Sequence, residues 1–239
     1  MRLVAIALFL LLVRATIAAQ ESSPTPVPQP APAEGKETEE ADEAKEESLD
    51  DLLKRIEKEH KEHKDFQGNF TQTKFLPLFG DKIESSGRFV FKKPDHVRWE
   101  YAKPHKSILV VTGESGKKWS ESTNRIENIK LSEDRGLDAV VKQLFTWFKG
   151  EFTKLKNDYD VSIKSREPVT LEMKPQNEIV RKFITSIEVK FAKGEGAITS
   201  VKLLEPLAKG DKEPGYTLYE FKDTKLDTDV KDEEFEIKK

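Results

Sequence analysis

The residues most suggestive of phosphate chemistry form a glycine-rich run, Gly113-Glu114-Ser115-Gly116-Lys117. In a phosphate-binding loop, backbone amides and a final hydroxyl hold the phosphates and their magnesium, so an earlier glycine and a Ser or Thr after the lysine are required. Those two positions are Val111 and Lys118 here. The run also fails as a serine-hydrolase elbow, because its last glycine comes one residue early. We therefore interpret it as a tight hairpin.

The four histidines are the remaining candidates for catalysis or metal binding. His60 and His63 share one side of a charged helical stretch and could touch one ion together, but an exposed, solvated face is the simpler interpretation. His96 and His105 lie in turn-like stretches with no nucleophile nearby in the sequence. We predict no catalytic constellation, no metal site and no cofactor. An exported hydrolase stays open only as a third hypothesis.

The first nineteen residues predict export. A basic start precedes an unbroken apolar run, Leu3 to Val13, and small residues follow it. This pattern is typical of a secretory signal peptide, here cleaved near Ala18 or Ala19, and the run is shorter than the roughly 20 apolar residues that cross a bilayer. The chain has no cysteine, hence no disulfide and no acylated-cysteine anchor. We expect a freely soluble protein outside the cytoplasm.

Residues 20–48 differ sharply in composition from the rest of the chain. Alternating prolines give way to a run of acids, and such a segment cannot bury enough apolar surface to become ordered. It predicts a disordered linker, with an acidic docking tail as the alternative. Residues 49–239 suit one domain and are mildly basic, without the concentrated Lys/Arg stripe of a nucleic-acid binder.

The apolar periodicity of this domain predicts an α+β fold. Leucines and an isoleucine at helical spacing indicate a helix from about Ser48 to Lys64, and a second helix is indicated at 134–149. Between and after them, alternation and turn residues predict many strands. These lie near residues 66–70, 88–92, 97–101, 108–111, 119, 126–129, 159–163, 169–173, 183–191, 197–204 and 215–221. Successive strands joined by short turns imply an antiparallel sheet that curls, with the helices on its concave face.

Two sets of apolar residues are the candidate site. Alternation places Phe89 with Phe91, and Val97 with Trp99, on one face of their strands. The predicted ligand cavity is lined by Phe70, Phe89, Phe91, Val97, Trp99, Leu109 and Trp119. The predicted lid is the apolar stripe of the second helix, formed by Leu137, Val140, Val141, Leu144, Phe145 and Phe148. On the residues alone, an ordinary packed core and a structural packing helix explain the two sets, and the ligand cavity and the lid are what a family resemblance implies.

One stretch of about fifty residues resembles a known family. It contains Phe66 with Phe70-Thr71-Gln72, then Gly87 to Pro94, then Val97-Arg98-Trp99, and after Pro104 an apolar strand and Gly116-Lys117-Lys118-Trp119. The order and spacing resemble the outer-membrane lipoprotein carriers of the LolA family, to which LolB-like and RseB-like half-barrels are related. Leu226-Asp227 followed by Phe235-Glu236-Ile237 resembles the family's closing strand.

The resemblance implies a half-open β-barrel with a helical lid over an apolar cavity. It implies a monomeric periplasmic carrier that takes acylated lipoprotein, or another lipid, from an inner-membrane release complex to an outer-membrane acceptor. The alternative is an RseB-like sensor that uses the same fold to bind a protein partner. Lys93 occupies the position of the family's lid-tethering arginine, and lysine lacks the planar fork of arginine. The Pro-Gly tail that serves targeting in many members does not follow the closing segment, so the resemblance does not extend to transfer to the family's usual receptor.

Overall fold

The computed structural model describes residues 47–133, 141, 145–194 and 196–237. Within them, eleven antiparallel strands form one sheet in the order β6-β5-β4-β3-β2-β1-β11-β10-β9-β8-β7. The strands are β1 Asp65–Leu76, β2 Asp81–Lys92, β3 His96–Lys103, β4 Ser107–Thr112, β5 Ser115–Ser120, β6 Arg125–Lys130, β7 Tyr159–Arg166, β8 Val169–Pro175, β9 Ser186–Phe191, β10 Ile198–Leu204 and β11 Tyr216–Leu226. The helical elements are α1 Leu49–Glu62, η2 Phe152–Asn157, α3 Glu178–Arg181 and η3 Asp232–Phe235.

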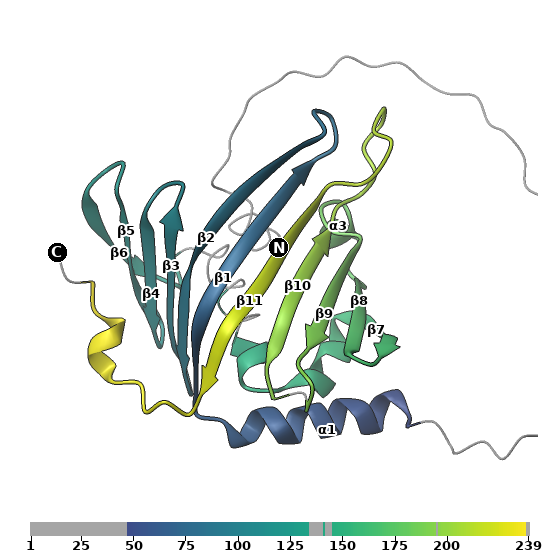
Figure 1. The fold of residues 1–239 in the computed structure, drawn as a ribbon, viewed down its shortest axis with the longest axis horizontal. Coiled ribbons are helices and arrows are strands. Elements are labelled where there is room, and N and C mark those ends of the chain that lie inside the picture. The colour runs from purple at the N-terminus through teal and green to yellow at the C-terminus, as the bar shows by residue number, and fades with distance from the viewer. Residues whose placement is uncertain (1–46, 134–140, 142–144, 195, 238–239) are drawn as a thin grey trace, which may run out of the picture.

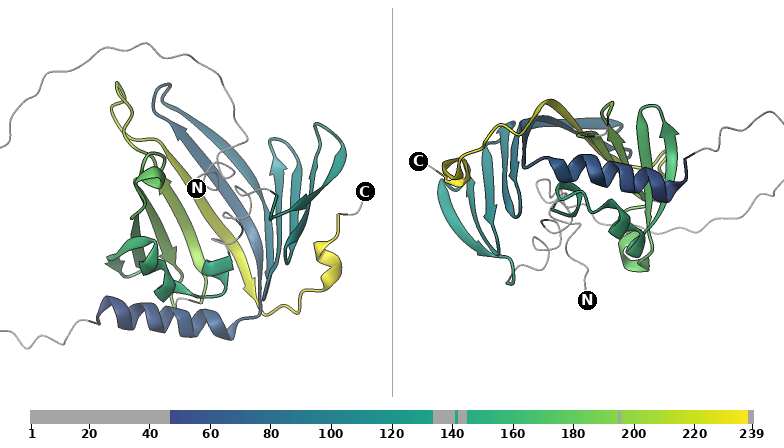
Figure 2. Two further views of the ribbon diagram at one scale, coloured as in Figure 1. Left: turned by 180° about the vertical axis from the view of Figure 1, so that it is seen from behind. Right: turned by 90° about the horizontal axis from the view of Figure 1, so that it is seen from below.

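The sheet curves around α1 and η2 without closing (Figures 1 and 2). Strands β1 to β6 form one meander and β7 to β11 a second, and β11 joins the two by pairing with β1 from Phe66↔Leu226 to Phe75↔Tyr216. The predicted curled antiparallel half-barrel of class α+β is therefore confirmed.

Helix α1 begins where the sequence indicates. The Ser48 side chain accepts a hydrogen bond from the Asp51 amide at 3.2 Å, and Asp50 and Asp51 place negative charge in the first turn, where the helix dipole favours it. The helix buries Leu52, Leu53 and Ile56 against the concave face of the sheet. This is the predicted apolar stripe.

The glycine-rich run forms the predicted hairpin. Strands β4 and β5 pair from Ser107↔Ser120 to Thr112↔Ser115, and Gly113 between them has a φ of 60°, a conformation that glycine adopts without strain. No phosphate loop is built there.

Two strand predictions are wrong in part. The strand predicted from Phe183 begins at Ser186 instead, because α3 and its Asn177 cap fill the connection before it. The predicted closing strand at 235–237 is also absent. Phe235 ends η3, and the C-terminal segment packs on the convex face of the sheet, where Val230 and Phe235 bury Val90 and Val110.

Candidate functional site

Aromatic side chains gather on the concave face of the sheet. Residues at alternate positions of β2 and β3 share that face, as the sequence predicts. Five of the predicted cavity residues lie buried in the core between the sheet and the helices, each at most 8% exposed: Phe70, Phe89, Phe91, Val97 and Trp99. Leu109 is partly buried against the same core. The predicted set therefore shares one buried environment, with one exception.

Trp119 is the exception. On β4, Leu109 packs against the concave core, whereas its neighbour Ile108 packs with the convex cluster around Val90 and Val110. The ladder pairs Trp119 with Ile108, and residues directly opposite in an antiparallel pair point to the same face. Trp119 therefore lies on the convex face, and we leave it out of the candidate cavity.

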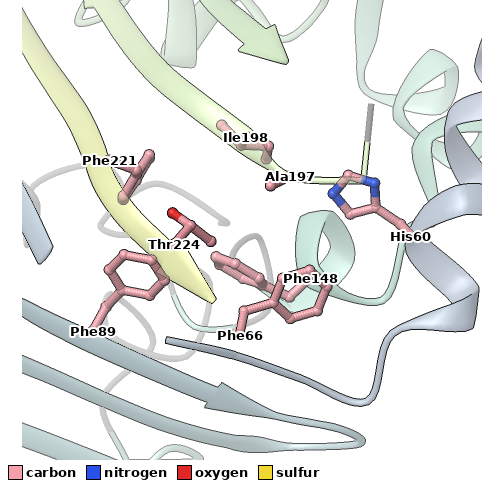
Figure 3. Close-up of a pocket in the computed structure, with 8 residues that line it drawn as sticks. All are labelled: His60, Phe66, Phe89, Phe148, Ala197, Ile198, Phe221 and Thr224. Atoms are coloured by element: carbon pink, nitrogen blue, oxygen red, sulfur yellow. The ribbon is translucent and has the colours of Figure 1, made fainter. Parts of the chain in front are cut away.

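A small pocket lies within this core beside α1 (Figure 3). Its free space is about 10 Å³, roughly the room that one water molecule needs. It is lined by His60, Phe66, Phe89, Phe148, Ala197, Ile198, Phe221 and Thr224. Apolar side chains from β1, β2, β10 and β11 thus surround it, and the structure shows it nearly filled.

Phe148 closes one side of the pocket. Residues 145–148 are helical, and the chain turns at Gly150 with a φ of 72°. The Phe148 ring stacks on Phe91 with centroids 3.4 Å apart and meets the Phe66 ring edge-on at 5.6 Å. These contacts place the end of the predicted lid helix directly against the aromatic side chains of the concave face.

The other predicted lid residues divide into two groups. Val141 is buried at 1% exposure, and Phe145 packs against the concave core. Leu137, Val140 and Leu144 lie outside the described residues. The described members therefore face the sheet with their apolar side.

His60 contradicts the exposed-face interpretation. Its side chain is 1% exposed and lies between the rings of Phe66 at 5.9 Å and Phe152 at 5.1 Å, measured between centroids. It reaches the pocket from the last turn of α1 (Figure 3). Its spacing four residues after Ile56 continues the leucine stripe. This spacing indicates that His60 is buried, and it was overlooked because the neighbouring residues in the sequence are charged.

Lys93 anchors the end of α1. Its Nζ donates hydrogen bonds to the carbonyl oxygens of His60 at 2.5 Å and Lys61 at 3.4 Å, and lies 5.9 Å from the centre of the Phe66 ring. Burial lowers the pKa of Lys93, while the Asp227 charge acts in the opposite direction. Within the described part of the chain, these hydrogen bonds reach α1, whereas the family resemblance implies a tether to the lid helix.

Two aspartates hold the junction beside the end of α1, one bonded to the chain after the helix and the other to the C-terminal segment. Asp227 accepts from the Lys64 amide and pairs with the His63 imidazole, both at 2.7 Å, and the His63 hydrogen bond lowers the pKa of Asp227. Asp65 is 4% exposed and accepts from the amide and hydroxyl of Thr228, both at 2.8 Å. The junction therefore ties α1, β1 and the C-terminal segment together.

The phenols around the concave core are uncharged at neutral pH. Burial raises the pKa of Tyr101, of Tyr159 to about 12, and of Tyr219 well above its ordinary range. The Tyr101 hydroxyl donates to Gln72 at 2.6 Å. A face of neutral aromatic groups suits an apolar ligand better than an ionic one.

The comparisons with known proteins agree with this architecture. The family model of outer membrane lipoprotein carrier protein LolA matches residues 61–238. The chain belongs to the LolA family. No curated protein sequence matches it.

Several solved structures are distantly similar to this LolA family member. A DUF1329 family protein from Desulfovibrio piger is 12% identical, with 78% of this chain and 95% of that chain covered and a TM-score of 0.41. The LolA superfamily protein NE2245 from Nitrosomonas europaea is 11% identical, with 79% and 97% covered and a TM-score of 0.40. The MucA/MucB complex of Pseudomonas aeruginosa is 14% identical, with 79% of this chain and 60% of that chain covered and a TM-score of 0.36.

Two further properties concern only the described residues of this LolA family member. None of their helices combines the length and the apolar character needed to cross a bilayer. No three of their His, Asp or Glu side chains come close enough together to hold a metal ion.

Proposed function

We propose that this chain is a periplasmic carrier that holds the acyl chains of a lipoprotein, or of another lipid, on the concave face of its sheet. The observation that carries the proposal is the ring of Phe66, Phe89 and Phe221 around a pocket that Phe148 closes. Transfer of one CH₂ group from water to an apolar site is worth about 0.8 kcal/mol, so a long acyl chain gains much from such a lining.

In this proposal, the rings that line the pocket occupy the space that an acyl chain would take. Ligand sites typically enclose about 300–1,000 Å³, far more than the 10 Å³ present here, so rings must move before an acyl chain can enter. Phe66, Phe89 and Phe221 stand on strands held by ladder hydrogen bonds on both sides. Phe148 stands at the end of a helical segment, so it is the ring that can leave at least cost. The ligand then takes the place of Phe148 against Phe91.

The family relationship supports the direction of transport. Membership in the LolA family and the predicted signal peptide both favour the space between the membranes of a double-membraned bacterium. There the carrier would receive its cargo from an inner-membrane release complex and deliver it to an outer-membrane acceptor. Exchange of the Phe148 ring for the cargo keeps the empty protein free of a large exposed apolar patch.

A partner-binding module is the second candidate. The observation that favours it is the same small pocket, because a concave face already packed with rings is stable without any ligand. In that case the sheet and its helices would recognise a membrane protein, and no lipid would be exchanged.

Native mass spectrometry separates the two candidates. The chain is expressed with its own leader and recovered from a bacterial periplasm, and its mass is recorded before and after organic extraction. A carrier shows a releasable lipid or acylated protein, and Phe148→Ala increases the bound fraction. Phe235→Ala is the control, because Phe235 is buried on the convex face and leaves the cavity untouched. A clean mass for all three proteins would contradict the carrier.

A further inference from the structure

Five large apolar side chains of the described residues are conspicuously exposed, and they come from three connections. Leu78 and Phe79 form the β1–β2 turn and are 71% and 58% exposed. Leu207, at 60%, lies in the β10–β11 loop. Ile179 and Phe183 belong to the α3 connection before β9. Scattered exposed apolar residues need no explanation, but a concentration of them marks a contact surface.

All three connections lie at one end of the sheet. The ladder pairs Phe75, at the end of β1, with Tyr216, at the start of β11, and pairs Leu204, at the end of β10, with Ser186, at the start of β9. Gly215 lies close enough to Pro77 that an added Cβ would stand 3.4 Å from its Cδ. Figure 1 shows these tips at the end of the sheet opposite α1, with the β1–β2 and β10–β11 tips projecting beyond it. We call this set the apolar tips.

Neighbouring connections at the same end are polar, so the tips are not a general property of that edge. The β3–β4 turn contains Pro104, His105 and Lys106, and residues 121–124 of the β5–β6 turn are Glu, Ser, Thr and Asn. The apolar side chains are confined to the central strands and the α3 connection.

The chemistry of the tips favours lipid over protein. They carry Leu, Ile and Phe, whereas the residues that dominate protein interfaces are Trp, Tyr and Arg, with Leu under-represented. Leu and Phe are the residues that interfacial segments bury at the boundary of headgroups and acyl chains. Charges around them are mixed: Arg181 and Lys182 adjoin Glu178, and Lys209 and Lys212 adjoin Asp211 and Glu213. These four cations and three anions leave a net charge of only about +1, too little for a strong attraction to anionic headgroups.

We propose that the apolar tips insert into the interface of a zwitterionic lipid bilayer and dock this end of the half-barrel on a membrane. The contact is reversible and apolar, and it does not depend on the lipid cavity proposed above. Leu78 and Phe79 insert from the β1–β2 turn, and Leu207 and Phe183 insert from the connections on either side of β10.

Flotation with phosphatidylcholine vesicles tests the proposal on protein recovered from the periplasm. The unchanged protein floats with the vesicles, and L78S/F79S lowers the partition constant at least about tenfold. Asp81→Ser changes an exposed polar side chain at the start of β2, directly after the same turn, and leaves flotation unchanged. Both variants alter exposed side chains, and circular dichroism with thermal unfolding verifies their fold. In Phe79→Trp, the added fluorescence shifts to shorter wavelength on vesicles and is quenched by brominated lipid.

Three results would overturn the proposal. One is the absence of flotation by the unchanged protein, which would direct attention to a protein partner for this end. Another is flotation that survives L78S/F79S. The last is flotation only on vesicles with anionic lipid that high salt abolishes, because that dependence belongs to lysine side chains. Flotation needs no cargo, so a protein that floats yet retains no lipid keeps this inference and contradicts the carrier function.

Discussion

Replacing Phe89 by alanine removes a ring from the centre of the concave core. Phe89 is 2% exposed, and its ring lies 5.7 Å from Phe91, 6.2 Å from Trp99 and 5.2 Å from Phe221, between centroids. These neighbours stand on β2, β3 and β11, and the ladders prevent the strands from collapsing into the space left behind. Phe→Ala in a packed core costs about 3–5 kcal/mol. We expect a loss in the free energy of unfolding near the upper part of that range.

Denaturant unfolding measures this loss, and Phe79→Ala provides the matched control. Phe79 is 58% exposed in the β1–β2 turn, so the same chemical change should alter stability by no more than about 0.5 kcal/mol. A loss below about 1 kcal/mol for Phe89→Ala, or equal losses for the two variants, would refute the reasoning that the rings form a rigid, dry core.

The enlarged cavity gives a second measurement on the same variant. Phe89→Ala leaves apolar space, which should bind a small apolar molecule that the unchanged protein excludes. At a concentration one hundred times its Kd, such a ligand restores about 2.7 kcal/mol. Equal stabilisation of the unchanged protein would show that its pocket is already open to ligand.

Three further changes test the junction and the convex face. Lys93→Met removes the hydrogen bonds to the end of α1, costs about 1 kcal/mol, and should speed amide exchange at His60 and Lys61 more than at the start of the helix. The hydrogen bond from His63 holds the pKa of Asp227 below 3.8. Asp227 therefore stabilises the fold above that pH, and this stabilisation is lost as the pH falls through the lower pKa of the folded state. In denaturant titrations, Asp227→Asn should flatten the decline in stability below about pH 4. Phe235→Ala should lower the unfolding free energy by about 2–4 kcal/mol, yet leave lipid retention in the mass spectrometry unchanged.

Local patterns in the sequence predicted much of the fold. Period-two alternation identified β1, β2 and β3, a short apolar run identified β4, and the Leu52, Leu53 and Ile56 stripe identified α1, because these patterns are read from neighbouring residues. The same alternation placed Phe89 with Phe91 on one face. It failed at Phe183, which lies in the turn after α3. The closing strand expected from the family resemblance is also wrong, because Phe235 ends the short helix η3.

Long-range placement could not be derived from the sequence. Trp119 and Leu109 look equivalent as apolar strand residues, and only the β4–β5 register assigns them to opposite faces, because a shift of one residue would reverse every side chain. His60 looks solvated among charges until α1 is docked on the sheet. The contact of Lys93 with α1 and the gathering of Leu78, Leu207 and Phe183 at one end both depend on strands far apart in the chain.

The sequence by itself determined the α+β class, the α1 boundaries, most strands and the concave aromatic face, since each follows from side-chain periodicity over a few residues. The tertiary structure alone decided that Phe148 fills the pocket, that His60 lines it, and that the C-terminal segment covers the convex face. Those features arise from packing between segments separated by a hundred residues or so. The free energy gained by burying apolar surface there depends on both segments, and no local sequence pattern identifies which two segments meet.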